Sequence, residues 1–131
     1  MRREFQLPQA DESFLNTLGR PWETVIDGSV RWVLIHDRVV PAGYTVATVS
    51  EAYRIETGYP DTQIDMVYFQ PSLQLSSGKT IGALSTQQIG GATWQQWSRH
   101  REPSFPWRPG VDDLSSHVLL VDHWLDREVA R

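Results

Sequence analysis

Cysteine is absent from the 131 residues of this sequence. This absence excludes disulfide bonds, zinc sites built on thiolates and nucleophilic thiols. It indicates no particular compartment, because reducing and oxidising environments both permit a protein without cysteine. Any covalent chemistry that the protein performs must therefore use a group other than a thiol.

Excess positive charge and long apolar runs are also lacking. The formal net charge of -4 and the isoelectric point near 5.5 argue against a broad basic face for nucleic acid. The densest basic patch is small and consists of Arg99, His100, Arg101 and Arg108. No apolar run near the amino terminus is long enough for a secretion signal or a membrane span. We therefore expect a soluble cytoplasmic protein with no nucleic-acid or membrane partner.

The residues that are present are those of an ordinary globular protein. Apolar residues make up 40% and charged residues 21% of the chain, and six residues are tryptophan. The length allows one sizeable core but not two. We expect a single domain over residues 1–131.

The first seventy residues predict one helix followed by strands. A helix is expected over 9–18, because Asp11 can cap its free amide groups, Gly19 can end it, and apolar residues share one face. Four strands are expected after it, the first two joined by a turn at Asp27-Gly28. Their expected ranges are 22–26, 30–36, 44–55 and 64–69.

Residues 70–110 lack regular periodicity and are rich in Ser, Gly, Gln and Pro. Irregular segments of this length are uncommon inside a compact domain unless they are functional, so a site is expected here. A short helix is expected within 92–99. A carboxyl-terminal helix is expected to begin at a cap on Asp112 or Asp113 and to run to about Val129, with an apolar stripe of Leu114, Val118, Val121 and Leu125.

This order of elements predicts the α+β class. The strands are consecutive and do not alternate with helices, which favours an antiparallel meander with the helices packed against it.

The motifs after the third predicted strand resemble those of the ubiquitin-conjugating (E2) fold. Tyr59-Pro60 before 66–69 resembles the E2 turn that leads into the last of four strands. Gln70-Pro71-Ser72 occupies the place of the family's His-Pro-Asn motif, and an ungapped count of eight residues from Ser72 puts Thr80 where E2 proteins have cysteine. Trp107-Arg108-Pro109 resembles the family's Trp-Pro feature.

The whole chain is more closely similar to the bacterial E2-like proteins called prokaryotic E2 family E. The segments that carry this resemblance are Leu7-Pro8, Gly58-Tyr59-Pro60-Asp61, Trp94-Gln95-Gln96-Trp97-Ser98-Arg99-His100-Arg101 and Pro109-Gly110-Val111-Asp112-Asp113-Leu114. The resemblance implies an E2-like fold with a helix, a four-stranded meander, a long irregular active-site segment and a helix. It also implies partners: an E1-like adenylating enzyme, a ubiquitin-like modifier and a JAB-type peptidase, commonly in defence-associated gene clusters.

An E2 protein passes an activated acyl group to an amine, which requires a nucleophile, oxyanion stabilisation and a base. Without cysteine only a hydroxyl can replace the thiol, and Thr80 is the favoured candidate, with Ser76 and Ser77 as alternatives. A hydroxyl needs a general base, and His100, oriented by Asp112 or Asp113, is the candidate. The alternative interpretation is that these are ordinary polar loop residues.

Other residues in the segment have similar pairs of interpretations. Within the Gln70-Pro71-Ser72 motif, Ser72 can donate to an oxyanion or stabilise a turn. A second set can form a stacking and cation-π surface for a partner's flexible tail or can cover the core, and consists of Trp94, Trp97, Trp107, Arg99 and Arg101. Asp113 and His117 lie one helical turn apart without a third metal ligand, so no metal site and no cofactor are expected.

Three functions follow from these interpretations. The first is an E2-like transferase that carries the modifier as an oxyester on a loop hydroxyl. The second is a non-catalytic E2-fold module that binds E1 or the modifier. The third is a Trp-rich ligand-binding domain with no connection to ubiquitin.

Overall fold

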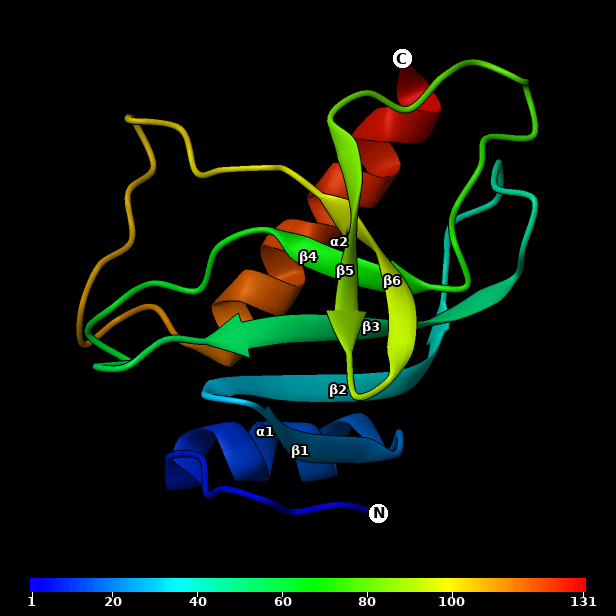
Figure 1. The fold of residues 1–131 in the computed structure, drawn as a ribbon. Coiled ribbons are helices and arrows are strands. Elements are labelled where there is room, and N and C mark those ends of the chain that lie inside the picture. The colour runs from blue at the N-terminus through cyan, green and yellow to red at the C-terminus, as the bar shows by residue number, and fades with distance from the viewer.

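A computed structural model describes residues 1–131 and has two helices and one antiparallel sheet (Figure 1). Helix α1 is Gln9–Leu18 and helix α2 is Leu114–Ala130. The sheet has six strands in the order β1-β2-β3-β4-β6-β5. The strands are β1 (Trp22–Asp27), β2 (Val30–Val39), β3 (Thr48–Ile55), β4 (Val67–Gln70), β5 (Leu84–Ile89) and β6 (Ala92–Trp97). The α+β class is confirmed, and the sheet has two strands more than expected.

The additional strands form a hairpin inside the segment that was expected to be irregular. The short helix expected within 92–99 is wrong, because this segment is β6. Trp94 and Trp97 lie three residues apart, which fits one helical face but also places them on opposite faces of a strand. Gly90 and Gly91 form the hairpin turn with φ of 58° and 84°, values that favour glycine.

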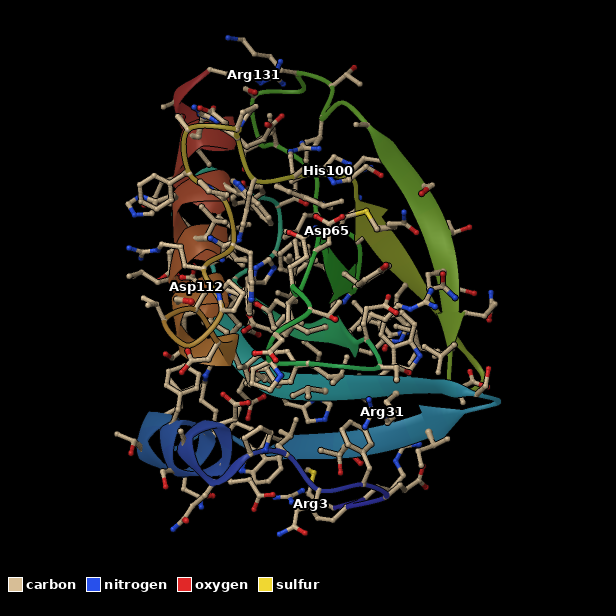
Figure 2. All side chains as sticks on the ribbon, turned by 90° about the vertical axis from the view of Figure 1, so that its left-hand side faces the viewer. Arg3, Arg31, Asp65, His100, Asp112 and Arg131 are labelled. Carbon is tan, nitrogen blue, oxygen red and sulfur yellow. The ribbon has the colours of Figure 1, made fainter.

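One face of the sheet carries the main core. Both helices cover this face, and Figure 2 shows them on the same side of the sheet. The predicted stripe of α2 is confirmed: Leu114, Val118, Val121 and Leu125 are all buried. Leu15 of α1 joins the same cluster.

The opposite face carries a second, smaller core. The β5–β6 hairpin bends over this face, so that it crosses β2, β3 and β4 in Figure 1. Gly90 at the tip of the hairpin donates its N–H to Asp27 Oδ2 at 2.9 Å, which joins it to the β1–β2 turn. Trp32 and Tyr68 meet edge to face at 5.0 Å within this core. The second core contains Val25, Trp32, Leu34, Ala52, Tyr68, Ile89 and Trp94.

The expected cap of α1 is wrong. The N-cap position is Pro8, with no side-chain cap, and Asp11 is buried one turn later. The Asp11 carboxylate accepts the Tyr59 O–H at 2.7 Å, and the Tyr59 oxygen accepts the Leu114 N–H at 2.8 Å. Burial raises the pKa of Asp11, although the Tyr59 hydrogen bond opposes this rise. Tyr59 therefore connects α1 to the first residue of α2.

The start of α2 is a capping box on Asp113, one of the two expected caps. The Asp113 carboxylate accepts the Ser116 N–H at 3.2 Å, and the Ser116 hydroxyl accepts the Asp113 N–H at 3.0 Å. Asp112 instead accepts the backbone N–H of Arg108 at 2.7 Å. Neither helix is long and apolar enough to cross a membrane.

A buried glutamate connects the helices to the middle of the sheet. Glu51 on β3 is fully buried and pairs with Arg38 at 2.7 Å and with Arg20 at 3.6 Å. Arg38 also contacts Asp122 of α2. Without these two arginines, Glu51 would place an unpaired negative charge in the core.

His117 is the most deeply buried titratable base. Its Nε2–H donates to the Met66 carbonyl oxygen at 2.8 Å, and Nδ1 has no partner. The rings of Tyr53 and Trp124 approach it edge-on at 5.5 and 5.6 Å. Burial lowers the pKa of His117 to about 4, more than the Met66 hydrogen bond raises it.

Acid is expected to destabilise the protein through His117. Its folded pKa of about 4 lies below the ordinary histidine pKa of about 6.5, so between these values the unfolded chain binds a proton that the folded protein does not. Lowering the pH from 7 to 4.5 should therefore cost the wild type about 2 kcal/mol more unfolding free energy than His117→Gln. Urea unfolding at both pH values measures this difference.

A glutamine can donate the same hydrogen bond to Met66 without titrating, which makes the comparison specific to the proton. His123→Gln, at an exposed histidine of the same helix, is the control and should keep the wild-type pH dependence. Equal losses in the wild type and His117→Gln would contradict the prediction.

Candidate functional site

The segment that follows β4 is the candidate active-site loop, residues 71–83. Its first half is held by Gln95 of β6, whose Oε1 accepts the Leu73 N–H at 2.9 Å and the Trp97 Nε1–H at 3.0 Å. Gln95 Nε2 donates to the Leu73 carbonyl at 3.1 Å. Leu73, Leu75 and Ile81 are buried beneath the loop. The loop is therefore an ordered segment with its apolar side chains in the main core.

The second half of the loop is attached to the carboxyl-terminal end of α2. Arg131 Nη2 donates to the Thr80 carbonyl at 2.6 Å, and Lys79 Nζ donates to the Arg131 carbonyl at 2.9 Å. Figure 1 shows this loop passing close to the end marked C. Arg131 also pairs with Glu128 at 2.8 Å, and Arg99 pairs with Glu128 at 3.5 Å. A chain of charged contacts therefore joins the loop, α2 and the segment after β6.

The three candidate hydroxyls are exposed on this loop. Thr80, Ser76 and Ser77 all point to solvent, and the Ser77 oxygen accepts the Lys79 N–H at 3.3 Å. None of the three hydroxyls is hydrogen-bonded to a histidine, so the loop by itself forms no pair of nucleophile and base.

The candidate base lies elsewhere and has a different partner from the one expected. His100 Nδ1 lies 2.9 Å from Asp65 Oδ2, and 64% of the His100 side chain is exposed. Figure 2 shows His100 beside Asp65 and away from Asp112. The expectation that Asp112 or Asp113 orients His100 is wrong, because these residues hold Arg108 and the start of α2.

The residues in the His-Pro-Asn place are divided between two roles. Gln70 Nε2 donates to the Thr93 carbonyl at 3.1 Å, which ties the end of β4 to β6. Pro71 and Ser72 are exposed, and the Ser72 hydroxyl makes no hydrogen bond within the protein. The Ser72 hydroxyl is therefore free, and it does not stabilise a turn, which was one of its two interpretations.

Residues 7–128 match the family described as Prokaryotic E2 family E. The chain belongs to prokaryotic E2 family E. No curated protein and no solved structure matches it. Family membership supports the interpretation of residues 71–83 as the E2-like loop, and it counts against the Trp-rich domain without a connection to ubiquitin.

The tryptophans of this E2 family E protein separate into core and surface residues. Trp94 and Trp97 are 3% and 0% exposed and belong to the two cores, which is the packing alternative. Trp107 is half-buried, and its Nε1–H donates to the Pro60 carbonyl at 2.9 Å. Two cation-π contacts form within the protein: Arg99 lies 4.9 Å from the Trp97 ring and Arg101 lies 4.9 Å from the Trp107 ring.

A groove of about 790 Å³ runs between the segment 98–113 and α2. Its loop wall includes His100, Arg101 and Phe105, and its helix wall includes Leu119 and Trp124. Arg101 Nε and Nη2 are buried there without a hydrogen-bond partner. The groove thus combines apolar side chains with an unpaired guanidinium.

Asp113 and His117, one helical turn apart, have separate structural roles. Asp113 caps α2, and His117 lies in the core and donates to Met66. No group of three side chains that could hold a metal ion forms in the structure.

Sequence reasoning missed Asp65, Gln95 and the groove. Asp65 and Gln95 act through residues 35 and 22 positions away, so nothing in their local sequence indicated their partners. The available signal for β6 was the alternation of apolar and polar residues over 92–95, which breaks at Gln96, and it did not indicate that Gln95 is buried.

Replacing Gln95 by Ala should loosen the loop. The change removes the partners of both Leu73 backbone groups and of Trp97 Nε1, which should lower the unfolding free energy by about 2–3 kcal/mol. It should also speed amide hydrogen exchange at Leu73. Gln88→Ala on exposed β5 is the matched control and should change neither quantity. Unchanged exchange at Leu73 in Gln95→Ala would show that Gln95 does not hold the loop.

Proposed function

We propose that this protein is the E2-like component of a bacterial ubiquitin-like conjugation pathway, in which it engages an E1-like adenylating enzyme and a ubiquitin-like modifier. Membership of prokaryotic E2 family E over residues 7–128 supports this proposal. Further support comes from the ordered loop 71–83 between β4 and β5, which follows the fourth strand as the active-site loop does in E2 proteins.

The form of the function that the geometry supports best is non-covalent docking. The observation that carries it is the composition of the loop: it has no thiol, and its exposed hydroxyls have no base within hydrogen-bonding distance. A hydroxyl without a base is a poor acyl acceptor near neutral pH. In this form acyl transfer does not pass through the loop.

The docking surface in this proposal comprises Trp107, Arg101 and Arg99 with the adjoining groove. Arg101 stacks on Trp107 and forms no ion pair within the protein, so its positive charge would attract a carboxylate of a partner's flexible tail. Phe105 and Leu119 are 67% and 59% exposed beside it and supply apolar contact area. The basic and apolar groups suit an extended peptide tail.

The second candidate is the transferase that carries the modifier as an oxyester on Thr80, Ser76 or Ser77. The exposure of Thr80, together with its place in the ungapped count, favours it. In this form His100, paired with Asp65, acts as the base once a movement of the loop or the binding of the partner brings His100 and the hydroxyl together.

Binding to the partners tests the docking form. Calorimetry with the E1-like enzyme and with the modifier should show stoichiometric binding to at least one of them. Arg101→Ala and Trp107→Ala should each weaken it about tenfold, because a partly buried arginine and an aromatic residue carry the contact. Arg54→Ala, at an exposed arginine on β3, is the control and should bind as the wild type does. Absence of binding to both partners would contradict the proposed function.

A covalent assay separates the two forms. When the protein is mixed with the E1-like enzyme, the modifier and ATP, the docking form predicts no adduct that survives thiol reductant. An adduct that survives reductant, is cleaved by hydroxylamine, is lost in Thr80→Ala and persists in Thr86→Ala would replace docking with the oxyester form. Thr86 is an exposed hydroxyl on β5 and therefore a matched control.

A further inference from the structure

A chain of three polar side chains crosses the first three strands. Ser50 Oγ of β3 lies 2.7 Å from His36 Nδ1 of β2, and His36 Nε2 lies 2.7 Å from Glu23 Oε2 of β1. Leu34 and Ala52 are each two residues along their strands from His36 and Ser50, and both belong to the second core. Side chains two apart on a strand share a face. These three side chains therefore lie on the face opposite the helices.

The chemistry of the three groups determines the direction of the hydrogen bonds. Burial alone would raise the pKa of Glu23, but hydrogen bonds from Arg2 and His36 outweigh it and lower that pKa to about 2. The ionised Glu23 can only accept, so His36 Nε2 carries the proton that it donates. In neutral His36 the Nδ1 atom is then the acceptor, and the Ser50 hydroxyl donates to it. The order of nucleophile, base and orienting acid is that of Ser-His-acid triads, with the two ring nitrogens exchanged: here Nδ1 faces the serine and Nε2 faces the acid.

Residues outside this trio hold Glu23 and the His36 backbone in place. Glu23 Oε1 accepts the backbone N–H of Arg2 at 3.2 Å and its Nε–H at 3.0 Å. The backbone N–H of His36 donates to the Pro21 carbonyl at 2.9 Å. The His36 side chain is 22% exposed and Ser50 is half-buried, so a small reagent can reach the pair.

A donor for a developing oxyanion lies beside Ser50. Gln70 pairs directly with Ser50 across β3 and β4, so that their side chains are neighbours on one face. Gln70 Nε2 uses one amide hydrogen for the Thr93 carbonyl, which leaves the second free to donate. Such a donor near the reacting atom stabilises the negative charge of an acyl-transfer intermediate.

We propose that Ser50 is a base-assisted nucleophile that accepts an activated acyl group, with His36 as general base and Glu23 as the residue that orients it. Ser50 Oγ attacks the carbonyl carbon of an ester or thioester, and its proton passes to His36 Nδ1. The bond to the leaving group then breaks, and His36 returns the proton to the departing alkoxide or thiolate. The products are an oxyester on Ser50 and a free alcohol or thiol.

This activity goes beyond docking and needs neither E1 nor modifier. Of the hydroxyls considered, those of the loop have no histidine partner, whereas Ser50 has one that is itself paired with a carboxylate. Hydrogen bonds that only stabilise the sheet would leave the hydroxyl unreactive, so covalent labelling separates the two roles.

The test uses an alkyl fluorophosphonate, in which the serine oxygen displaces fluoride from phosphorus. Intact-mass measurement of the full chain should show one adduct per molecule, and peptide mapping should place it on Ser50. Ser50→Ala should remove the label, and Glu23→Gln should slow labelling about a hundredfold. With p-nitrophenyl acetate the same variants should lose the release of nitrophenol in parallel.

Ser85→Ala and Ser29→Ala, at exposed serines on β5 and in the β1–β2 turn, are the controls and should label as the wild type does. Thermal unfolding verifies that Ser50→Ala is folded. An unlabelled wild type, or labelling of Ser50→Ala at the wild-type rate, would overturn the proposal. Since no pathway partner is present, neither result affects the proposed role in conjugation.

Discussion

The short pairing between β4 and β6 is the contact on which the rest of the architecture depends. It covers three residue pairs, Val67 with Trp97, Tyr68 with Gln96 and Phe69 with Gln95. Beyond these pairs β6 leaves β4, and the hairpin bends across the far face of the sheet. The pairing thereby places Trp97 in the main core, Trp94 in the second core and Gln95 against loop 71–83.

Buried polar groups determine where the two helices sit on this sheet. Tyr59 joins Asp11 of α1 to the start of α2, and Glu51 reaches α2 through Arg38 and Asp122. Buried ion pairs contribute little net stability, because desolvation offsets their attraction. Their effect here is geometric: removing one partner would leave a charge in the core, so alternative placements of α1 or α2 are disfavoured. The helices, in turn, provide one wall of the groove and the end to which loop 71–83 is attached.

The two faces of the sheet therefore offer different chemistry. The helix side and its loop carry exposed hydroxyls, an arginine stacked on tryptophan and an apolar groove, all of which suit binding. The opposite face carries a serine whose hydrogen-bond partners are those of a nucleophile. A missing thiol in an E2-like protein thus does not remove every reactive arrangement, because strand pairing brings Glu23, His36 and Ser50 together outside loop 71–83.

The features that followed from the sequence alone are local. The 9–18 helix, the β1–β2 turn, the stripe of α2 and a cap at Asp112 or Asp113 follow from spacing and capping preferences that act within a few residues. The E2-like family was also readable from motifs. Three features were settled only by the tertiary structure, because each depends on contacts with distant residues. They are the burial of Asp11 beside Tyr59, the pairing of His100 with Asp65 and the strand conformation of Ala92–Trp97. Two tryptophans three residues apart, Trp94 and Trp97, fit a helix and a strand equally well, and only pairing with the free edge of β4 selects the strand.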